Sequence, residues 1–369
     1  MFQFNFAVDE ATDELIAAPM TSASHEPPTV DHLPSNAAAP EPFRELSLDS
    51  LLDALPSQIS YSPLSVPLSD GNELKLARRD LFDARFQLIS EGTAEPEVQA
   101  SDAETTSALQ FLDNPSDLIP LVYEGGLKTW ECSLDLVSYL SSIDYCDDLR
   151  GMRILELGCG TAVPTLYILH KIFSSEPNTE ADIHVHLQDY NASVLQLVTL
   201  PNIILTWYHS PAADDYRNSE NHEALESELN ITPLLGAFKT SLQSFGICLR
   251  IFSGSWDTFK LETTGGNYNL LLTSETIYRP VSLPSLISLM RDACQVVSLS
   301  DSDRLQEGKH RYLCLVAAKI VYFGVGGGVP EFVRCIEQAN NGENVKARVD
   351  VVWEKTLGVS RQVMSIRWT

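Results

Sequence analysis

A hydrophobic stretch that ends in two glycines is the part of the sequence best suited to hold a nucleotide-like ligand. Residues 153–157 are predicted to form a buried strand, and Gly158 and Gly160 follow it directly. Glycines let the backbone turn tightly and approach a ligand closely, and the start of the following helix offers N–H groups to an anion. Further along, Asp189 ends the next predicted strand and can accept both hydroxyls of a ribose. This pattern is typical of a nucleotide-binding α/β protein.

Two positions near this turn distinguish between possible ligands. A dinucleotide-binding turn has a third glycine or an alanine where this chain has Val163, followed by Pro164. Glu156 would repel a pyrophosphate, but its charge suits the cationic amino group and sulfonium of S-adenosylmethionine (SAM). We therefore expect SAM as the cofactor and a methyltransferase, with a nicotinamide-dependent dehydrogenase as the nearest alternative.

Aromatic residues near the predicted strands have two readings each. Trp130 and Glu131 precede the first strand and could cover the cofactor and pair with its ammonium, or Trp130 could anchor a helix to the sheet. Trp256 follows Gly254 and Ser255 and could pack near the adenine or close the core. Spacing alone leaves both alternatives open.

The strand expected to face the methyl acceptor ends at Ser274, Glu275 and Tyr278. Enzymes that methylate amino groups of nucleic-acid bases commonly have an Asn or Asp, two prolines and an aromatic residue here, and this chain does not. Glu275 and Tyr278 are the polar residues able to hold an acceptor, so both are candidate catalytic residues. Glu275 could instead cap a helix or hold the loop.

The elements that position these residues alternate along the chain. Such alternation predicts a mainly parallel sheet with helices on both faces, whose ligands bind at the carboxyl ends of the strands. The exits at Gly158, Asp189 and Ser274 should therefore lie close together. Strands are expected at 153–157, 184–187, 203–205, 248–252, 268–273, 312–317, 350–353 and 363–368, and helices at 133–143, 163–172, 194–198 and 283–296.

Domain boundaries follow from composition. Up to Asp53 there are ten acidic residues against Arg44 alone, and such a segment buries too little apolar surface to order itself. We expect a disordered acidic tail over 1–55 and one methyltransferase domain over 56–369. The polar residues 209–245 interrupt the pattern and are expected to be an insertion.

The net charge and the cysteine content exclude some classes of binding partner and of structural site. The 369-residue chain has a formal net charge of −25, which disfavours duplex nucleic acid and suits a basic protein. The seven cysteines form no CxxC pair, so neither a disulfide framework nor a metal site is expected.

The chain has no apolar run long enough for a membrane span, and it does not begin with the basic and apolar residues of a leader peptide. We expect a cytoplasmic and nuclear protein, and no heptad pattern calls for more than a monomer.

A set of short runs, in chain order, resembles the eukaryotic protein-histidine N-methyltransferase family, which modifies a histidine of a large-subunit ribosomal protein. The most specific are SETIY at 274–278 and GVGGGV at 324–329. The start of the chain, with Phe2, Phe4 and Phe6, resembles fungal members. The other runs are 117–120, 122–128, 130–132, 188–191, 199–202 and the residues flanking the two strings, 273 and 322–323.

This resemblance implies a class I, Rossmann-like, seven-stranded SAM-dependent methyltransferase fold and methylation of the ring nitrogen remote from the backbone, the tele nitrogen. It also implies cofactor contacts at 131–135, 158, 188–190, 254, 255 and 274. Joined to the residues above, the predicted cofactor-binding set is Trp130, Glu131, Cys132, Ser133, Leu134, Asp135, Glu156, Gly158, Gly160, Gln188, Asp189, Tyr190, Gly254, Ser255, Trp256 and Ser274.

Two alternatives stay open. One is a SAM-dependent lysine methyltransferase of the same fold, and the other is a SAM-binding module for ribosome assembly. Histidine, with a side-chain pKa of about 6.5, needs little deprotonation at neutral pH, whereas lysine, at about 10.4, needs much more. A histidine-specific enzyme must mainly orient the ring and select its tautomer, and Glu275 is the candidate for that role.

Overall fold

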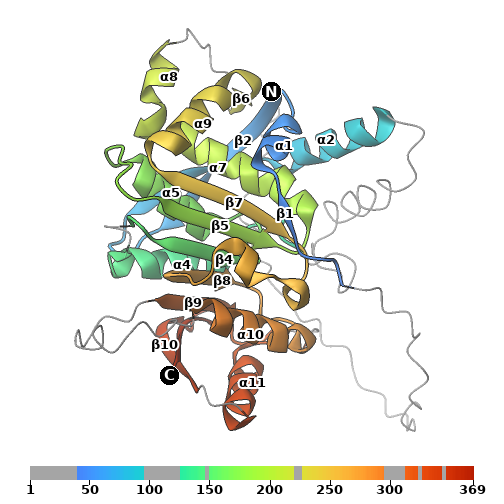
Figure 1. The fold of residues 1–369 in the computed structure, drawn as a ribbon, viewed down its shortest axis with the longest axis vertical. Helices are drawn as coiled ribbons and strands as arrows, with labels where there is room; N and C mark the ends of the chain where they lie inside the picture. The colour runs from blue at the N-terminus through green and yellow to red at the C-terminus, as the bar shows by residue number, and fades with distance from the viewer. Residues whose placement is uncertain are drawn as a thin grey trace, which may run out of the picture. The chain divides into compact units, whose positions relative to one another are not determined.

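The structure, a computed structural model, describes residues 40–94, 125–145, 149–219, 227–294, 312–322, 326–342 and 346–369. Its centre is a sheet in the order β1-β7-β5-β4-β8-β9-β11-β10, in which β7 lies above β5 in Figure 1 and β9 and β10 lie below β8. The strands are β1 (Arg44–Leu46), β4 (Arg153–Leu157), β5 (Ile183–Asp189), β7 (Ile247–Ser253), β8 (Leu270–Ser274), β9 (Leu313–Lys319), β10 (Ala347–Lys355) and β11 (Arg361–Trp368).

Strand direction confirms the predicted, mainly parallel sheet. Strands β7, β5, β4, β8 and β9 pair in parallel, whereas β11 is antiparallel to both β9 and β10. The chain leaves β4 for β5 on one side and later places β8 on the other, so the sheet has its switch point beside β4. Ligands of open α/β sheets bind outside the carboxyl ends of the strands at such a point.

Two hydrophobic cores lie on opposite faces of this sheet. Alternate residues of β4 divide between them, with Ile154 in one core and Leu155 and Leu157 in the other, because successive side chains of a strand point to opposite faces. The first core includes residues of α4 (Glu131–Ser142), α5 (Val163–Phe173), α7 (Leu200–Tyr208) and α9 (Leu235–Ser244). The second includes residues of α10 (Leu283–Cys294) and α11 (Val329–Gly342).

A smaller antiparallel sheet, β3-β2-β6, lies beside α4 and α7. Buried Arg79 at the end of β3 links it to the main body, because its guanidinium donates to the Leu197 carbonyl at 3.0 Å and its backbone N–H donates to Asn202 at 2.9 Å. The elements of this layer are β2 (Gln58–Pro67), β3 (Glu73–Arg79), α2 (Leu81–Ala94) and β6 (Glu228–Asn230). Short helical segments complete the fold: α6 (Ala192–Val194), η2 (Leu195–Thr199), η3 (Pro211–Ala213), α8 (Asp214–Ser219), η4 (Thr232–Leu234), η5 (Trp256–Thr258), η6 (Leu261–Thr264) and η7 (Pro280–Ser282).

Two predictions about the middle of the chain are wrong. The strand expected at 203–205 lies inside α7, where every residue is buried. A helix buried on all sides lacks the exposed polar face by which a helix is recognised in sequence. Residues 209–245 are not an irregular insertion, because β6 extends the small sheet and α9 buries Phe238 and Leu242.

The expected boundary of the N-terminal tail is also wrong. Strand β1 pairs with the edge strand β7, and α1 (Leu48–Asp53) buries Leu51 and Leu52. The ring of Phe43 lies 4.5 Å from that of Phe259, centroid to centroid. Residues 40–55 therefore belong to the fold, and residues 1–39 lie outside the described residues.

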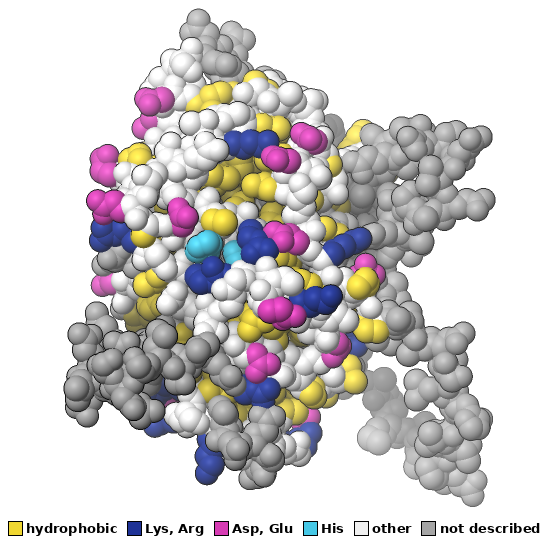
Figure 2. All heavy atoms as spheres, in the orientation of Figure 1, with side chains coloured by type: hydrophobic (Ala, Val, Ile, Leu, Met, Phe, Trp, Pro, Cys, Tyr) yellow, Lys and Arg dark blue, Asp and Glu magenta, His cyan; other side chains and the backbone are white. Residues whose placement is uncertain are grey.

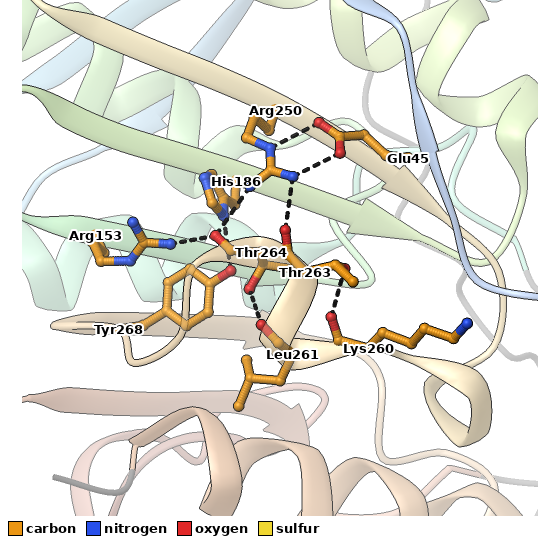
Figure 3. Close-up of polar contacts among 9 residues, drawn as sticks. All are labelled: Glu45, Arg153, His186, Arg250, Lys260, Leu261, Thr263, Thr264 and Tyr268. Carbon is orange, nitrogen blue, oxygen red and sulfur yellow. Dashed lines mark hydrogen bonds and ion pairs between the residues drawn. The ribbon is translucent and has the colours of Figure 1, made fainter. Parts of the chain in front are cut away.

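A polar network holds the connection between β7 and β8 against the sheet (Figure 3). Arg153 donates to the Thr264 carbonyl at 2.5 Å, and Arg250 donates to the same carbonyl at 3.0 Å. The two arginines therefore donate to a carbonyl at the end of η6, where the backbone carbonyls have no partner within the helix. Arg250 also binds both oxygens of Glu45, so β1 is part of the network. Figure 2 shows histidine side chains among basic and acidic ones on this face.

Within the described ranges, no helix is long and apolar enough to cross a bilayer. The same residues contain no group of three or more His, Cys, Asp and Glu side chains arranged to hold a metal ion.

Candidate active site

The glycine turn after β4 joins two neighbouring loops by close backbone contact. Gly158 and Gly160 have φ angles of +60° and +50°, a region that glycine adopts without strain. A Cβ at Gly158 would lie 2.6 Å from the Thr276 methyl, and one at Gly160 would lie 3.0 Å from the Gly126 carbonyl. The turn therefore lies directly between the SETIY string and the Gly125–Gly126 segment.

Gln188, at the end of β5, ties three loops together. Its Oε1 accepts from the Trp256 indole at 2.8 Å and from the Gly158 N–H at 3.3 Å, and its Nε2 donates to the Gly254 carbonyl at 2.7 Å. The side chain is buried. Gln188 thus sets the position of Trp256 relative to the glycine turn.

Asp189 stands beside the same turn, as its strand exit predicts. Its carboxylate accepts from the Gly160 N–H at 2.9 Å and from the Asn191 N–H at 3.1 Å. Asn191 in turn donates to the Gly125 carbonyl at 3.1 Å. These bonds fix the carboxylate at the place where a ribose would be held, and the cofactor role of Asp189 stays a prediction.

Glu156 has a structural role that its sequence position did not suggest. Its Oε2 accepts from the Thr165 N–H at 3.0 Å and the Thr165 hydroxyl at 2.5 Å, so it caps the first turn of α5. Burial raises the pKa of the Glu156 carboxyl to about 8. Its Oε1 is buried with no hydrogen-bond partner among the described residues, so a contact with a cofactor cation stays a prediction for this atom alone.

Only some of the cofactor-binding residues predicted at the start of α4 lie at the strand exits. The Asp135 carboxylate is held by the Arg361 guanidinium, with contacts of 2.5 and 3.2 Å, which makes it part of a buried ion pair. Ser133 bonds the Trp130 carbonyl at 2.7 Å. Leu134 packs against the first core, and Cys132 is completely buried, with its thiol facing the Glu275 carboxylate. Trp130 and Glu131 remain at the strand exits.

The loop after β7 is covered by the start of the described chain. A Cβ at Gly254 would lie 2.4 Å from the Pro42 carbonyl, and the Ser255 N–H donates to the Glu41 carbonyl at 2.9 Å. The Tyr190 hydroxyl accepts from the Glu41 N–H at 3.4 Å. Glycine is therefore required at 254 because another part of the chain approaches it, a reason that local sequence cannot reveal.

Glu275 is the centre of a second cluster at the ends of β8 and β9. Its Oε2 accepts from the Tyr322 hydroxyl at 2.5 Å, and its Oε1 lies 3.8 Å from the Lys319 ammonium. Lys319 also lies 3.4 Å from the Glu131 carboxylate and 4.6 Å from the Trp130 ring centroid. The structure thus brings Trp130 and Glu131 next to Glu275. Ser274, half-buried, is the last residue of β8.

The glycine-rich run packs against the SETIY string. A Cβ at Gly327 would lie 2.1 Å from the Tyr278 carbonyl, and the Gly328 N–H donates to the Ile277 carbonyl at 3.0 Å. The ring of Tyr278 lies 6.3 Å from that of Tyr322, edge to face. Gly327 and Gly328 are therefore needed for close backbone contact beside the predicted acceptor site, while residues 323–325 lie outside the described residues.

Sequence reasoning missed Lys319, Tyr322 and Arg361 as members of the site. Lys319 ends β9, two residues beyond the end of the strand predicted at 312–317, so no local signal marked it. The pairing of β9 with β8 and of β11 with β9 brings these residues to the same edge, and neither pairing can be read from local patterns.

The residues at this edge suit SAM as a ligand. A bare glycine backbone, the orphaned Oε1 of Glu156 and the carboxylates of Glu131 and Asp189 surround one strand-exit region. With β1 set aside, the sheet holds its strands in the chain order third, second, first, fourth, fifth, seventh, sixth, with the seventh antiparallel. This order and this site define a class I, SAM-dependent methyltransferase.

Comparisons with known proteins place the chain more narrowly. It is 33% identical to "Histidine protein methyltransferase 1" of Schizosaccharomyces pombe, over 88% of this chain and 87% of that protein. It is 32% identical to the Saccharomyces cerevisiae protein of the same name, over 93% and 92%. The chain belongs to the histidine protein methyltransferase family and is a SAM-dependent protein methyltransferase.

The other comparisons add little to this assignment. No protein-family model matches the chain. Among solved structures, a magnesium protoporphyrin IX methyltransferase from Synechocystis with bound SAH has a TM-score of 0.33 and 9% identity, over 76% of this chain and 92% of that one. The fold assignment therefore depends on the strand order itself.

Proposed function

We propose that this protein transfers a methyl group from SAM to the tele nitrogen of a histidine in a basic, large-subunit ribosomal protein. The yeast relatives are named for protein histidine, which supports the residue type. The acidic net charge of −25 supports a basic partner. We further propose that the enzyme acts as a monomer in the cytoplasm and nucleus.

The observation that carries the choice of histidine is the state of the Glu275 carboxylate. Its side chain is 9% exposed, one oxygen is held by Tyr322, and Oε1 has no hydrogen-bond partner among the described residues. A buried acceptor of this kind is costly unless something donates to it. An imidazole N–H is a suitable donor, because neutral histidine has one protonated and one unprotonated ring nitrogen.

This geometry supports a specific division of the two ring nitrogens. When SAM is bound, it supplies a methyl group carried on a sulfonium. Glu275 would accept the N–H of the nitrogen nearer the backbone, which leaves the lone pair of the tele nitrogen to form the new N–C bond. SAM would supply the methyl group and keep the electron pair of the C–S bond on sulfur, and Glu275 would take the ring proton that the product must lose. Tyr278 would border the acceptor ring.

The test is incubation of the enzyme with methyl-tritiated SAM and an extract of cells that lack it. We expect label in one basic ribosomal protein, recovered on hydrolysis as tele-methylhistidine. Label in methyl-lysine would contradict the proposal and favour the lysine-specific alternative. A Gly158→Arg variant that retains the cellular phenotype would instead favour an assembly module.

A matched pair of variants tests the role of Glu275. Glu275→Gln should lower labelling on the order of a hundredfold at saturating SAM, because general acid–base groups typically contribute about 10²–10⁴-fold. Glu354→Gln, at an exposed position of β10, serves as the control and should leave labelling unchanged. Equal rates for the two variants would remove Glu275 from the mechanism.

A further inference from the structure

Tyr322 is built into the structure as a hydrogen-bond donor to Glu275. Its hydroxyl donates to Glu275 Oε2 at 2.5 Å and accepts from the Lys319 backbone N–H at 3.3 Å. Burial and the charge of Glu275 raise the pKa of the Tyr322 hydroxyl well above its ordinary value, so the phenol keeps its proton. One carboxylate oxygen is therefore occupied by the protein itself.

The Lys319 ammonium lies between the carboxylates of Glu131 and Glu275. It lies 3.4 Å from Glu131 and 3.8 Å from Glu275 Oε1, above the Trp130 ring. The distance to Glu275 is too long for a hydrogen bond. The cation therefore leaves Oε1 able to accept from another donor. The Cys132 thiol also faces the Glu275 carboxylate, but a thiol is only a weak donor.

The backbone of Glu275 has an unusual conformation that is consistent with this arrangement. Its φ is +58°, a left-handed value that residues with a Cβ rarely adopt. The Glu275 N–H donates to the Ala317 carbonyl of β9 at 2.9 Å. This bond ties the strained residue to the strand that leads to Lys319 and Tyr322.

We propose that Tyr322 and Lys319 are positioning residues for the acceptor, which act through Glu275. Tyr322 fixes the rotation of the carboxylate, and Lys319 places a positive charge 3.8 Å from Oε1, so that Oε1 is the oxygen left to accept the imidazole N–H. The inference rests on the proposed histidine methylation and assigns to residues outside SETIY the selection of the ring nitrogen that is methylated.

A double-mutant cycle tests whether Tyr322 works through Glu275. The measurement is the initial rate of tritium transfer to protein histidine, with saturating SAM and an extract of cells that lack the enzyme. We expect Tyr322→Phe alone to lower the rate about tenfold, and to lower it by less than about twofold in a Glu275→Gln background, because residues in one network are not additive. If the double variant falls to the product of the two single effects, the proposal is wrong.

Binding and stability measurements separate positioning from simple damage. The affinity for SAM, measured by calorimetry, should be unchanged in Tyr322→Phe, and a large loss would contradict the proposal. Tyr312→Phe is the control: this residue flanks the opposite end of β9 and bonds the Trp368 backbone, so its loss should cost stability without changing the rate.

Lys319 gives an independent route if the tyrosine variant does not fold. Lys319→Met should lower the rate about tenfold, Lys319→Arg should restore most of it, and Lys319→Met should have little effect in the Glu275→Gln background. Equal rates for the Met and Arg variants would overturn the role. Wild-type enzyme that labels no histidine would refute the proposed function, whereas labelled histidine with an additive cycle would refute only this inference.

Discussion

Replacement of Glu156 by glutamine offers a quantitative test of the site's electrostatics. The carboxyl is 1% exposed, and its pKa is about 8 in the folded protein against an ordinary value of 4.5. The folded state therefore keeps a proton that the unfolded chain releases. The stability that depends on this proton is complete below pH 4.5 and is lost as pH rises through about 8. Glutamine keeps an acceptor for Thr165 but cannot ionise.

The expected magnitude follows from linkage. One proton of difference changes the free energy of unfolding by about 1.4 kcal/mol per pH unit. Between pH 6 and pH 8 the wild-type protein should lose about 2 kcal/mol relative to Glu156→Gln. The assay is urea unfolding of both proteins at several pH values in this range. A stability difference that does not change with pH would refute the argument.

The same pair of proteins tests whether Glu156 meets a cofactor cation. A cation near Oε1 would favour the charged carboxylate, so SAM binding at pH 7 should release up to about one proton from the wild-type protein and none from Glu156→Gln. Calorimetric titrations in two buffers of different ionisation enthalpy measure this release. Equal proton release by both proteins would remove Glu156 from the cofactor contacts.

Three further predictions concern the framework. Arg361→Met should cost about 3–5 kcal/mol of stability in urea unfolding, because it leaves Asp135 charged and buried. Adding Asp135→Leu should recover much of this loss. A loss below ~1 kcal/mol would mean that the ion pair is effectively solvated. Gly158→Ala should weaken SAM binding in calorimetry and cost more stability than Gly358→Ala. Both glycines have a positive φ, but of the two only Gly158 has an atom within 3 Å of the added Cβ. Equal stability costs would exclude the steric cause. Removal of residues 40–55 as well as those before them should lower the melting temperature relative to removal of 1–39 alone, because it deletes the β1 pairing, and equal melting temperatures would contradict this.

Local patterns predicted most of the elements but not all of their boundaries. Strands β4, β5, β7, β8, β9, β10 and β11 were expected, because buried parallel strands appear as short apolar runs between turns. Helix α7 was taken for a strand because its buried surface surrounds it completely. The pairing of β1 was missed because three residues at a sheet edge carry no periodic signal.

For the site, the sequence located residues but not their partners. It indicated Asp189 beside the glycine turn, and the structure confirms this contact at 2.9 Å. It could not show that Asp135 pairs with Arg361, since these residues lie 226 positions apart and meet only through the order of the sheet.

The sequence by itself therefore determined the class of the fold, the glycine turn and, through SETIY and GVGGGV, the family. Those features depend on short-range periodicity and on backbone conformations that only glycine tolerates. Tertiary structure decided which carboxylate is used for what: Glu156 caps a helix, Asp135 is neutralised by Arg361, and Glu275 is held between Tyr322 and Lys319. The physical reason is that the state of a carboxylate depends on burial and on charges within a few ångströms, and strands far apart in the chain supply both.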